Sequence, residues 1–364
     1  MTHSEGERIL YLDALRTIAS LAVVTLHVSA SNTYYVDFHS HAWNIFMQFE
    51  AVVNWAVPMF TMISGAVMLP KEWNYQKVFA KCKRLILIFF IWSAFYLVFD
   101  LLNNGIETYQ NAIWLQVLFQ GHYHMWYLLM LFGLYLIIPL LKAITAKRQN
   151  LVSFVCFSAL FTFFVPSVVG LTYVRGVRNI FQLPVIGALY RALQNVVEDV
   201  NFFLTLGFAA YFVIGYALVN YVQLPRKKCA VYGITSMAFG TVIMILELYF
   251  SVSKDAIGIL LKYNQVGILL QACGLLLFAK ANPEGKTIYF LAKISPVTLG
   301  IYLIHPIFIE ILQHAGVTSL SFNPWFSIPI LSICIFIAAG IVTRIIMSTP
   351  ARVIVSTGGG KKDA

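Results

Sequence analysis

The sequence predicts an all-α, polytopic integral membrane protein with about ten transmembrane helices. Of its 364 residues, 60% are hydrophobic and only 11% are charged, and the mean hydropathy of +0.78 exceeds that of soluble globular chains. Apolar runs recur at close to the roughly 20 residues that a helix needs to cross a bilayer. The expected spans are residues 9–31, 43–69, 76–102, 124–144, 150–171, 202–222, 229–250, 264–281, 287–313 and 325–348.

The connections between these spans alternate in charge, and this alternation predicts their orientation. Those after the second, fourth, sixth and eighth spans are rich in Lys and Arg, whereas the others hold few. The positive-inside rule then places both termini in the cytoplasm. The net charge of +10 reflects topology, so no nucleic-acid partner is expected. Residues 1–350 are expected to form one transmembrane domain, followed by a short basic cytoplasmic tail at 351–364. The longest outer connection, 172–201, is expected to hold a short helix or a re-entrant piece.

The first span carries three ionisable residues, Asp13, Arg16 and His27, inside an apolar segment. At about 100° per residue, the path from Arg16 to His27 completes about three turns. Both side chains therefore lie on one helix face, about 16 Å apart along the axis. Ionisable groups in lipid cost at least a few kcal/mol each, so this face must contact protein or water. We expect it to form one wall of an internal site.

The second span places a carboxylate, Glu50, in the same outer part of the membrane as His27. Two interpretations of Glu50 stay open: a group that reaches water at a helix end, or a member of the internal site. Pro58 and Gly65 lie further along the same helix face. They indicate a kink and a close helix contact.

The third span begins with Lys81 and Arg84, which are neighbours at i, i+3 on a helix. An ordinary cytoplasmic anchor would explain both residues. The alternative is an anion site, in which Arg84 forks onto phosphate oxygens and Lys81 supplies a point charge, with Arg16 behind them. Such a site would suit a phosphate-bearing cofactor that approaches from the cytoplasm.

Histidines mark the outer halves of the fourth and ninth spans. His122 and His124 are two residues apart and diverge by about 200° if helical, so at most one can point at the site. In the ninth span Tyr302 and His305 share one face, directly before Pro306. His305 either satisfies carbonyls that the proline frees or joins the histidines of the first and fourth spans.

The cysteines and the lack of internal repeats argue against disulfide or metal sites and against many transporter folds. The five cysteines are scattered through apolar stretches without CxxC or Cys/His spacing, so neither disulfides nor a metal centre is expected. No inverted pair of broken segments stands out, which disfavours many transporter folds.

Five motifs then follow one another along the chain. They are Arg-x10-His in a first helix that opens LDALRTIASL, MFTMISG at the end of the second, the basic x-x-basic pair, HMWY at the entry of the fourth, and SPVTLGIYLIHP near the end. Together they resemble the acyltransferase-3 family, integral-membrane acyltransferases that modify bacterial surface glycans. Within that family the chain is similar to the stand-alone O-acetyltransferases of the enterobacterial-common-antigen type. Two departures are Lys81, where the family often has arginine, and Thr17, which replaces a common glycine.

The resemblance implies an O-acyltransferase of the bacterial inner (plasma) membrane. Its donor would be acyl-CoA, above all acetyl-CoA, and its acceptor a hydroxyl of a surface glycan or a lipid-linked saccharide. Arg16, Lys81 and Arg84 would hold the CoA phosphates at the cytoplasmic mouth, with membrane lipids around the helices. The sequence leaves open the acyl group, the acceptor sugar, the leaflet of transfer and whether the chain forms a homo-oligomer.

The resemblance also gives the histidines roles. His27 would be the general base, because a histidine with a pKa of about 6.5 accepts a proton at neutral pH. Glu50 would be its carboxylate partner. His124, Tyr302 and His305 would donate to the developing oxyanion or orient the acceptor. An acyl-histidine intermediate is an alternative.

Two rival functions fit the same polar face. A proton-coupled transporter or flippase of a glycan precursor would use the ionisable residues as a relay. A scaffold protein would use them for helix packing. Consumption of acyl-CoA separates the acyltransferase from both.

Overall fold

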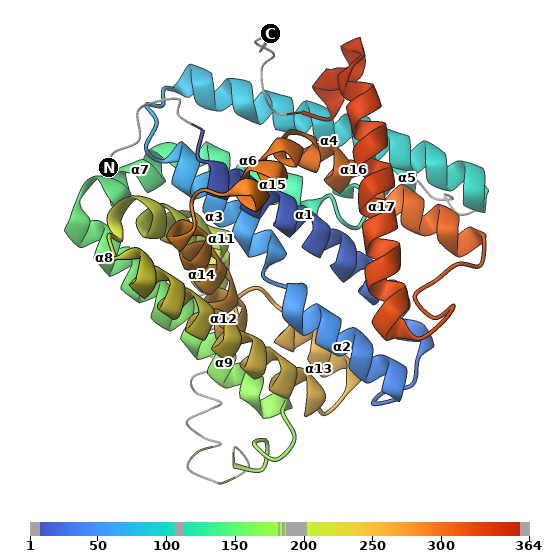
Figure 1. Cartoon of the computed structure of the whole chain (residues 1–364), viewed down its shortest axis with the longest axis horizontal. Coiled ribbons are helices and arrows are strands. Elements are labelled where there is room, and N and C mark those ends of the chain that lie inside the picture. The colour runs from blue at the N-terminus through green and yellow to red at the C-terminus, as the bar shows by residue number, and fades with distance from the viewer. Residues whose placement is uncertain (1–7, 106–112, 181–182, 184–185, 187–201, 357–364) are drawn as a thin grey trace.

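A computed structural model describes residues 8–105, 113–180, 183, 186 and 202–356 of the chain (Figure 1). Within these residues the secondary structure is helical, apart from one isolated bridge between Val174 and Ser251. The helices are α1 (Leu10–Ala30), α2 (His41–Val53), α3 (Ala56–Met68), α4 (Tyr75–Asn104), α5 (Ile113–Gln120), α6 (Trp126–Leu136), α7 (Ile138–Ala146), α8 (Arg148–Phe157), α9 (Val165–Gly170), α11 (Phe202–Tyr216), α12 (Arg226–Tyr249), α13 (Lys254–Leu260), α14 (Val266–Ala281), α15 (Lys286–Ile294), α16 (Thr298–His314) and α17 (Pro324–Met347).

The structure confirms an all-α polytopic membrane protein. Seven helical segments of the described chain are long and apolar enough to cross a bilayer: Leu10–Tyr35, His41–Met68, Tyr75–Asn103, Arg148–Tyr173, Arg226–Tyr249, Lys286–His314 and Pro324–Met347. Helices α6 and α7 make an eighth span if they are counted together, bent by 56°. The expected spans 202–222 and 264–281 hold the shorter apolar helices Gly207–Tyr221 and Val266–Ala281. Most of the connection 172–201, with its expected short helix, lies outside the described residues.

Proline and glycine shape the second span as the sequence predicts. The helix is interrupted between α2 and α3 at Asn54 and Trp55, and Asn54 is four residues before Pro58, whose ring displaces the carbonyl at that position. The Asn54 side chain donates to the Leu261 carbonyl at 2.9 Å, which fixes the break. Gly65 then permits close approach to α11, since a Cβ there would lie 1.8 Å from the Phe212 carbonyl oxygen.

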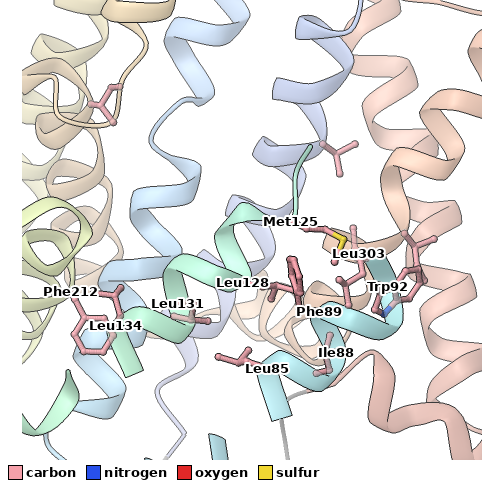
Figure 2. Packing of buried hydrophobic residues seen from close by; sticks show 14 of the residues in the cluster. Leu85, Ile88, Phe89, Trp92, Met125, Leu128, Leu131, Leu134, Phe212 and Leu303 are labelled. Carbon is pink, nitrogen blue, oxygen red and sulfur yellow. The ribbon is translucent and has the colours of Figure 1, made fainter. Parts of the chain in front are cut away.

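Helix α1 lies in the middle of the molecule (Figure 1) and packs against α2, α3, α14, α15, α16 and α17. Beside it, α4 packs on α6 through large buried side chains, including Phe89, Trp92, Met125 and Leu128 (Figure 2). Outer helices such as α12 and α17 instead expose apolar side chains, as membrane spans do. Because α1 is enclosed by other helices, its polar face contacts protein.

Candidate active site

Two histidines meet where α1 passes α16. His305 of α16 is fully buried, and its Nε2 lies 3.3 Å from Nδ1 of His27 in α1. The other ring nitrogen of His305, Nδ1, lies 3.1 Å from the carbonyl oxygen of Ile301, one turn earlier. The two imidazole rings have centroids 5.0 Å apart. The expected convergence of the first and ninth spans therefore occurs at the side-chain level.

These two hydrogen bonds assign the proton positions of the neutral pair. The Ile301 carbonyl can only accept, so His305 must carry its proton on Nδ1 and present an unprotonated Nε2. His27 must then donate from Nδ1 to His305. A neutral imidazole carries one proton, so Nε2 of His27 is left as an acceptor. That nitrogen has the protonation state that a general base requires.

His124 adds a third imidazole from the connection before α6. Its ring centroid lies 5.5 Å from that of His305 and 6.4 Å from that of His27. The Tyr302 hydroxyl donates at 2.6 Å to the backbone carbonyl of His124, which holds this connection against α16. A tyrosine has one hydroxyl proton, so in this arrangement Tyr302 positions His124 and has no second proton for an oxyanion.

His122 and His124 lie in the turns before α6, so the divergence of about 200° expected for helical residues does not apply to them. The ring of His122 stacks on Tyr96 of α4 with centroids 4.2 Å apart, and its Nε2 lies 3.0 Å from a carboxylate oxygen of Glu310. The two histidines stay linked, because their Nδ1 atoms are 3.1 Å apart. The sequence interpretation gave no role to Glu310, which follows His305 by five residues and so lies on a different side of α16.

The described hydrogen bonds do not pair Glu50 with His27. Nδ1 of His27 bonds to His305, and the buried Glu50 carboxylate instead accepts from the Thr33 hydroxyl at 3.4 Å. Glu50 and His27 lie on α2 and α1, and no periodicity within one helix sets how the two helices rotate toward each other. A catalytic role for Glu50 stays a prediction, but the group that orients His27 is an imidazole.

At the other end of the α1 polar face, Arg16 is bound to Asp13. Their side chains are 2.7 Å apart, and the buried Asp13 carboxylate also accepts from Arg8 and from Ser295. The contact to Asp13 is made by Nη1 of Arg16, and the side chain of Arg16 remains about one-third exposed.

The two basic residues of α4, Lys81 and Arg84, contact different partners. Nζ of Lys81 lies 5.9 Å from the ring centroid of Trp73, in the connection before α4. Arg84 forks onto a single oxygen, the carbonyl of Ser356, through Nε at 3.1 Å and Nη2 at 2.7 Å. The start of the predicted tail is therefore docked on α4, where Trp92 also donates to the Ile354 carbonyl at 2.9 Å.

Comparison with known families identifies the family of the chain. A family model described as an acyltransferase domain matches residues 9–344. The chain belongs to the acyltransferase-3 family. No curated protein and no solved structure gives a match. Family membership makes the protein a membrane-bound acyltransferase, with an acyl donor and an acceptor.

The described histidines are of the kind that acyl transfer uses, an imidazole acceptor with a second imidazole beside it. His27 presents an unprotonated Nε2, and His305 can stabilise the imidazolium that forms when His27 takes up a proton. His124 is 2% exposed, and its Nε2 has no hydrogen-bond partner among the described residues. A buried polar atom without a partner is costly, which is expected where a reacting group will bind.

Proposed function

We propose that this protein is an O-acyltransferase of a bacterial inner membrane. It transfers an acyl group, most simply acetyl, from cytoplasmic acyl-CoA to a hydroxyl of a surface glycan or a lipid-linked saccharide. One observation carries the proposal: the same face of α1 holds an unprotonated imidazole nitrogen at His27 and an arginine at position 16. The two are separated by about 16 Å along the helix. An extended thioester donor can reach from one to the other.

The donor end uses the inner basic residues. Arg16 offers the remaining edge of its guanidinium to a CoA phosphate, while Asp13 fixes its orientation. Lys81 supplies a point charge at the entrance. Arg84 already holds one oxygen in its fork, so a phosphate would take the place of the Ser356 carbonyl. The pantetheine arm then follows the α1 face past the buried hydroxyl of Ser20, which has no partner within the described chain.

Transfer proceeds by general-base catalysis. Nε2 of His27 takes the proton of the acceptor hydroxyl, and the acceptor oxygen attacks the thioester carbonyl carbon. The new C–O bond forms as the carbonyl electrons move onto oxygen, and His124 faces the developing negative charge. Collapse of this intermediate breaks the C–S bond, and His27 returns the proton to the thiolate sulfur. The products are an ester and free CoA.

An acyl-histidine route uses the same nitrogen. Nε2 of His27 would attack the thioester first and expel CoA as the thiolate, which takes a proton from solvent, and would then carry the acyl group until the acceptor hydroxyl arrives. Release of CoA without any acceptor, in an amount equal to the enzyme, would indicate this two-step route.

Incubation of the purified protein with labelled acetyl-CoA tests the proposal. We expect release of CoA and transfer of label to a saccharide acceptor, and both should be lost in His27→Ala. A transporter or flippase would leave acetyl-CoA intact. If acetyl-CoA stays intact when the folded protein is incubated with it and with an acceptor, acetyl-CoA is not the donor.

A further inference from the structure

The structure contains a row of three titratable groups that leads from the histidine cluster toward the surface. Glu310 contacts His122 at 3.0 Å, and His122 contacts His124 at 3.1 Å. The Glu310 and His122 side chains are 25% and 21% exposed, whereas His124 is 2% exposed. We infer that Glu310 and His122 form a proton relay that allows His124 to act as the oxyanion donor. This inference rests on the function proposed above.

Hydrogen bonding fixes the direction of the row in its neutral form. The Glu310 carboxylate only accepts, so His122 carries its proton on Nε2 and leaves Nδ1 unprotonated. His124 must then donate from its own Nδ1 to His122. Its Nε2 is consequently a buried acceptor with no partner in the described chain. In this form His124 repels an oxyanion and does not stabilise it.

One added proton converts His124 into a donor. A solvent proton, carried by a hydronium ion that is left as water, binds to Nε2 of His124, and the proton on Nδ1 of His124 passes to Nδ1 of His122. His124 ends neutral, with an N–H at Nε2. His122 becomes an imidazolium paired with the Glu310 carboxylate. The positive charge thus lies at the partly exposed end of the row, and the reverse transfers return the proton.

The surroundings favour charge at His122 over charge at His124. His122 has a carboxylate partner on α16 and the face of Tyr96 on α4. His124 is enclosed by His305 and Tyr302 of α16 and by His27 of α1, and none of these carries negative charge. An isolated buried charge is costly, so the proton should rest on the imidazole beside the carboxylate. Glu310 and His122 are therefore positioning residues that act through His124.

Two substitutions test the relay by steady-state CoA release. Glu310→Gln keeps the size and hydrogen bonding of the side chain but removes its negative charge. We expect kcat to fall about tenfold, the usual difference between a charged and a neutral hydrogen-bond partner, with KM for acetyl-CoA and acceptor within about twofold. His122→Phe keeps an aromatic ring on Tyr96 and should lower kcat by roughly 10- to 100-fold. This is below the loss of about 10² to 10³ that removal of an oxyanion donor causes.

The double variant separates a relay from independent effects. Because Glu310 acts only through His122, the double variant should be no slower than His122→Phe alone. Asp255→Asn, at an exposed carboxylate of α13, is the control and should retain full activity. Unchanged kcat in Glu310→Gln, a change in KM alone, or multiplied losses in the double variant would overturn the relay while leaving acyl transfer intact. Absence of CoA release from the unmodified protein would instead overturn the proposed function.

Discussion

Replacement of His305 tests whether this imidazole orients and stabilises His27, the proposed general base. The hydrogen bond from Nδ1 of His27 to Nε2 of His305 is 3.3 Å long and becomes charge-assisted when His27 takes the acceptor proton. A neutral hydrogen bond contributes about 0.5–1.5 kcal/mol, and one to a charged group about 1.5–3 kcal/mol. The gain between ground and transition state is thus about 1–2 kcal/mol. His305→Ala should therefore lower kcat by roughly 5- to 30-fold.

His305→Gln should recover much of this loss, because its amide oxygen can accept from Nδ1 of His27. By contrast, His27→Ala removes the base and should cost about 10² to 10⁴ in rate. The assay is CoA release from acetyl-CoA, with donor affinity and thermal stability measured on the same preparations. His314→Gln, an exposed histidine of the same helix, is the matched control. The reasoning is refuted if His305→Gln is no faster than His305→Ala, or if a folded, donor-binding His27→Ala protein still transfers at a substantial rate.

Other substitutions test the donor end, the helix packing and the orientation. Arg16→Ala should weaken acyl-CoA binding by roughly 10- to 150-fold through loss of a charged contact, and Arg16→Lys should restore little of it. If a folded Arg84→Ala protein binds acyl-CoA with unchanged affinity, Arg84 only anchors the C-terminal segment and does not bind the donor. Gly65→Ala should lower stability by about 1–3 kcal/mol or more, because its Cβ would lie 1.8 Å from a backbone oxygen. Gly133→Ala is the control and should not lower stability, because a Cβ there has no neighbour within 4 Å. Equal melting temperatures for the Gly65→Ala and Gly133→Ala proteins would contradict the tight contact at Gly65. Tyr35→Cys, an exposed site after α1, should react with an impermeant thiol reagent from outside, and reaction only from the cytoplasm would reverse the orientation.

The helices and the polar face of α1 could be predicted from sequence, because both follow from strong local constraints. An apolar run long enough to cross a bilayer must be helical, since every backbone polar group needs a partner inside the segment. The same cost forces Arg16 and His27 toward protein, and a period of 3.6 residues puts them on one face. The break near Pro58 and the contact at Gly65 were predictable for the same reason, because each depends on the backbone of one residue.

The partners of the site residues could not be predicted, because they depend on how separate helices rotate against one another. His305 replaces Glu50 beside His27 through the meeting of α1 and α16, which sequence spacing does not encode. Glu310 was missed because it is five residues from His305, about 140° around the helix, and outside the face used to select candidates. A carboxylate near the outer end of an apolar helix was nevertheless a signal, since such a group needs a partner.

Arg16 and Arg84 differ in how far their present contacts leave the guanidinium free for the proposed donor. The Arg84 fork closes on the Ser356 carbonyl with the same two-donor geometry that would hold a phosphate oxygen. A doubly charged phosphate group is a stronger acceptor than a neutral carbonyl, so donor binding at Arg84 would release this contact of the C-terminal segment. Arg16 needs no such exchange, because Asp13 occupies one edge of its guanidinium and about one-third of the side chain is exposed. Donor affinity should therefore depend more on Arg16 than on Arg84, since at Arg84 part of the binding energy replaces a hydrogen bond that already exists.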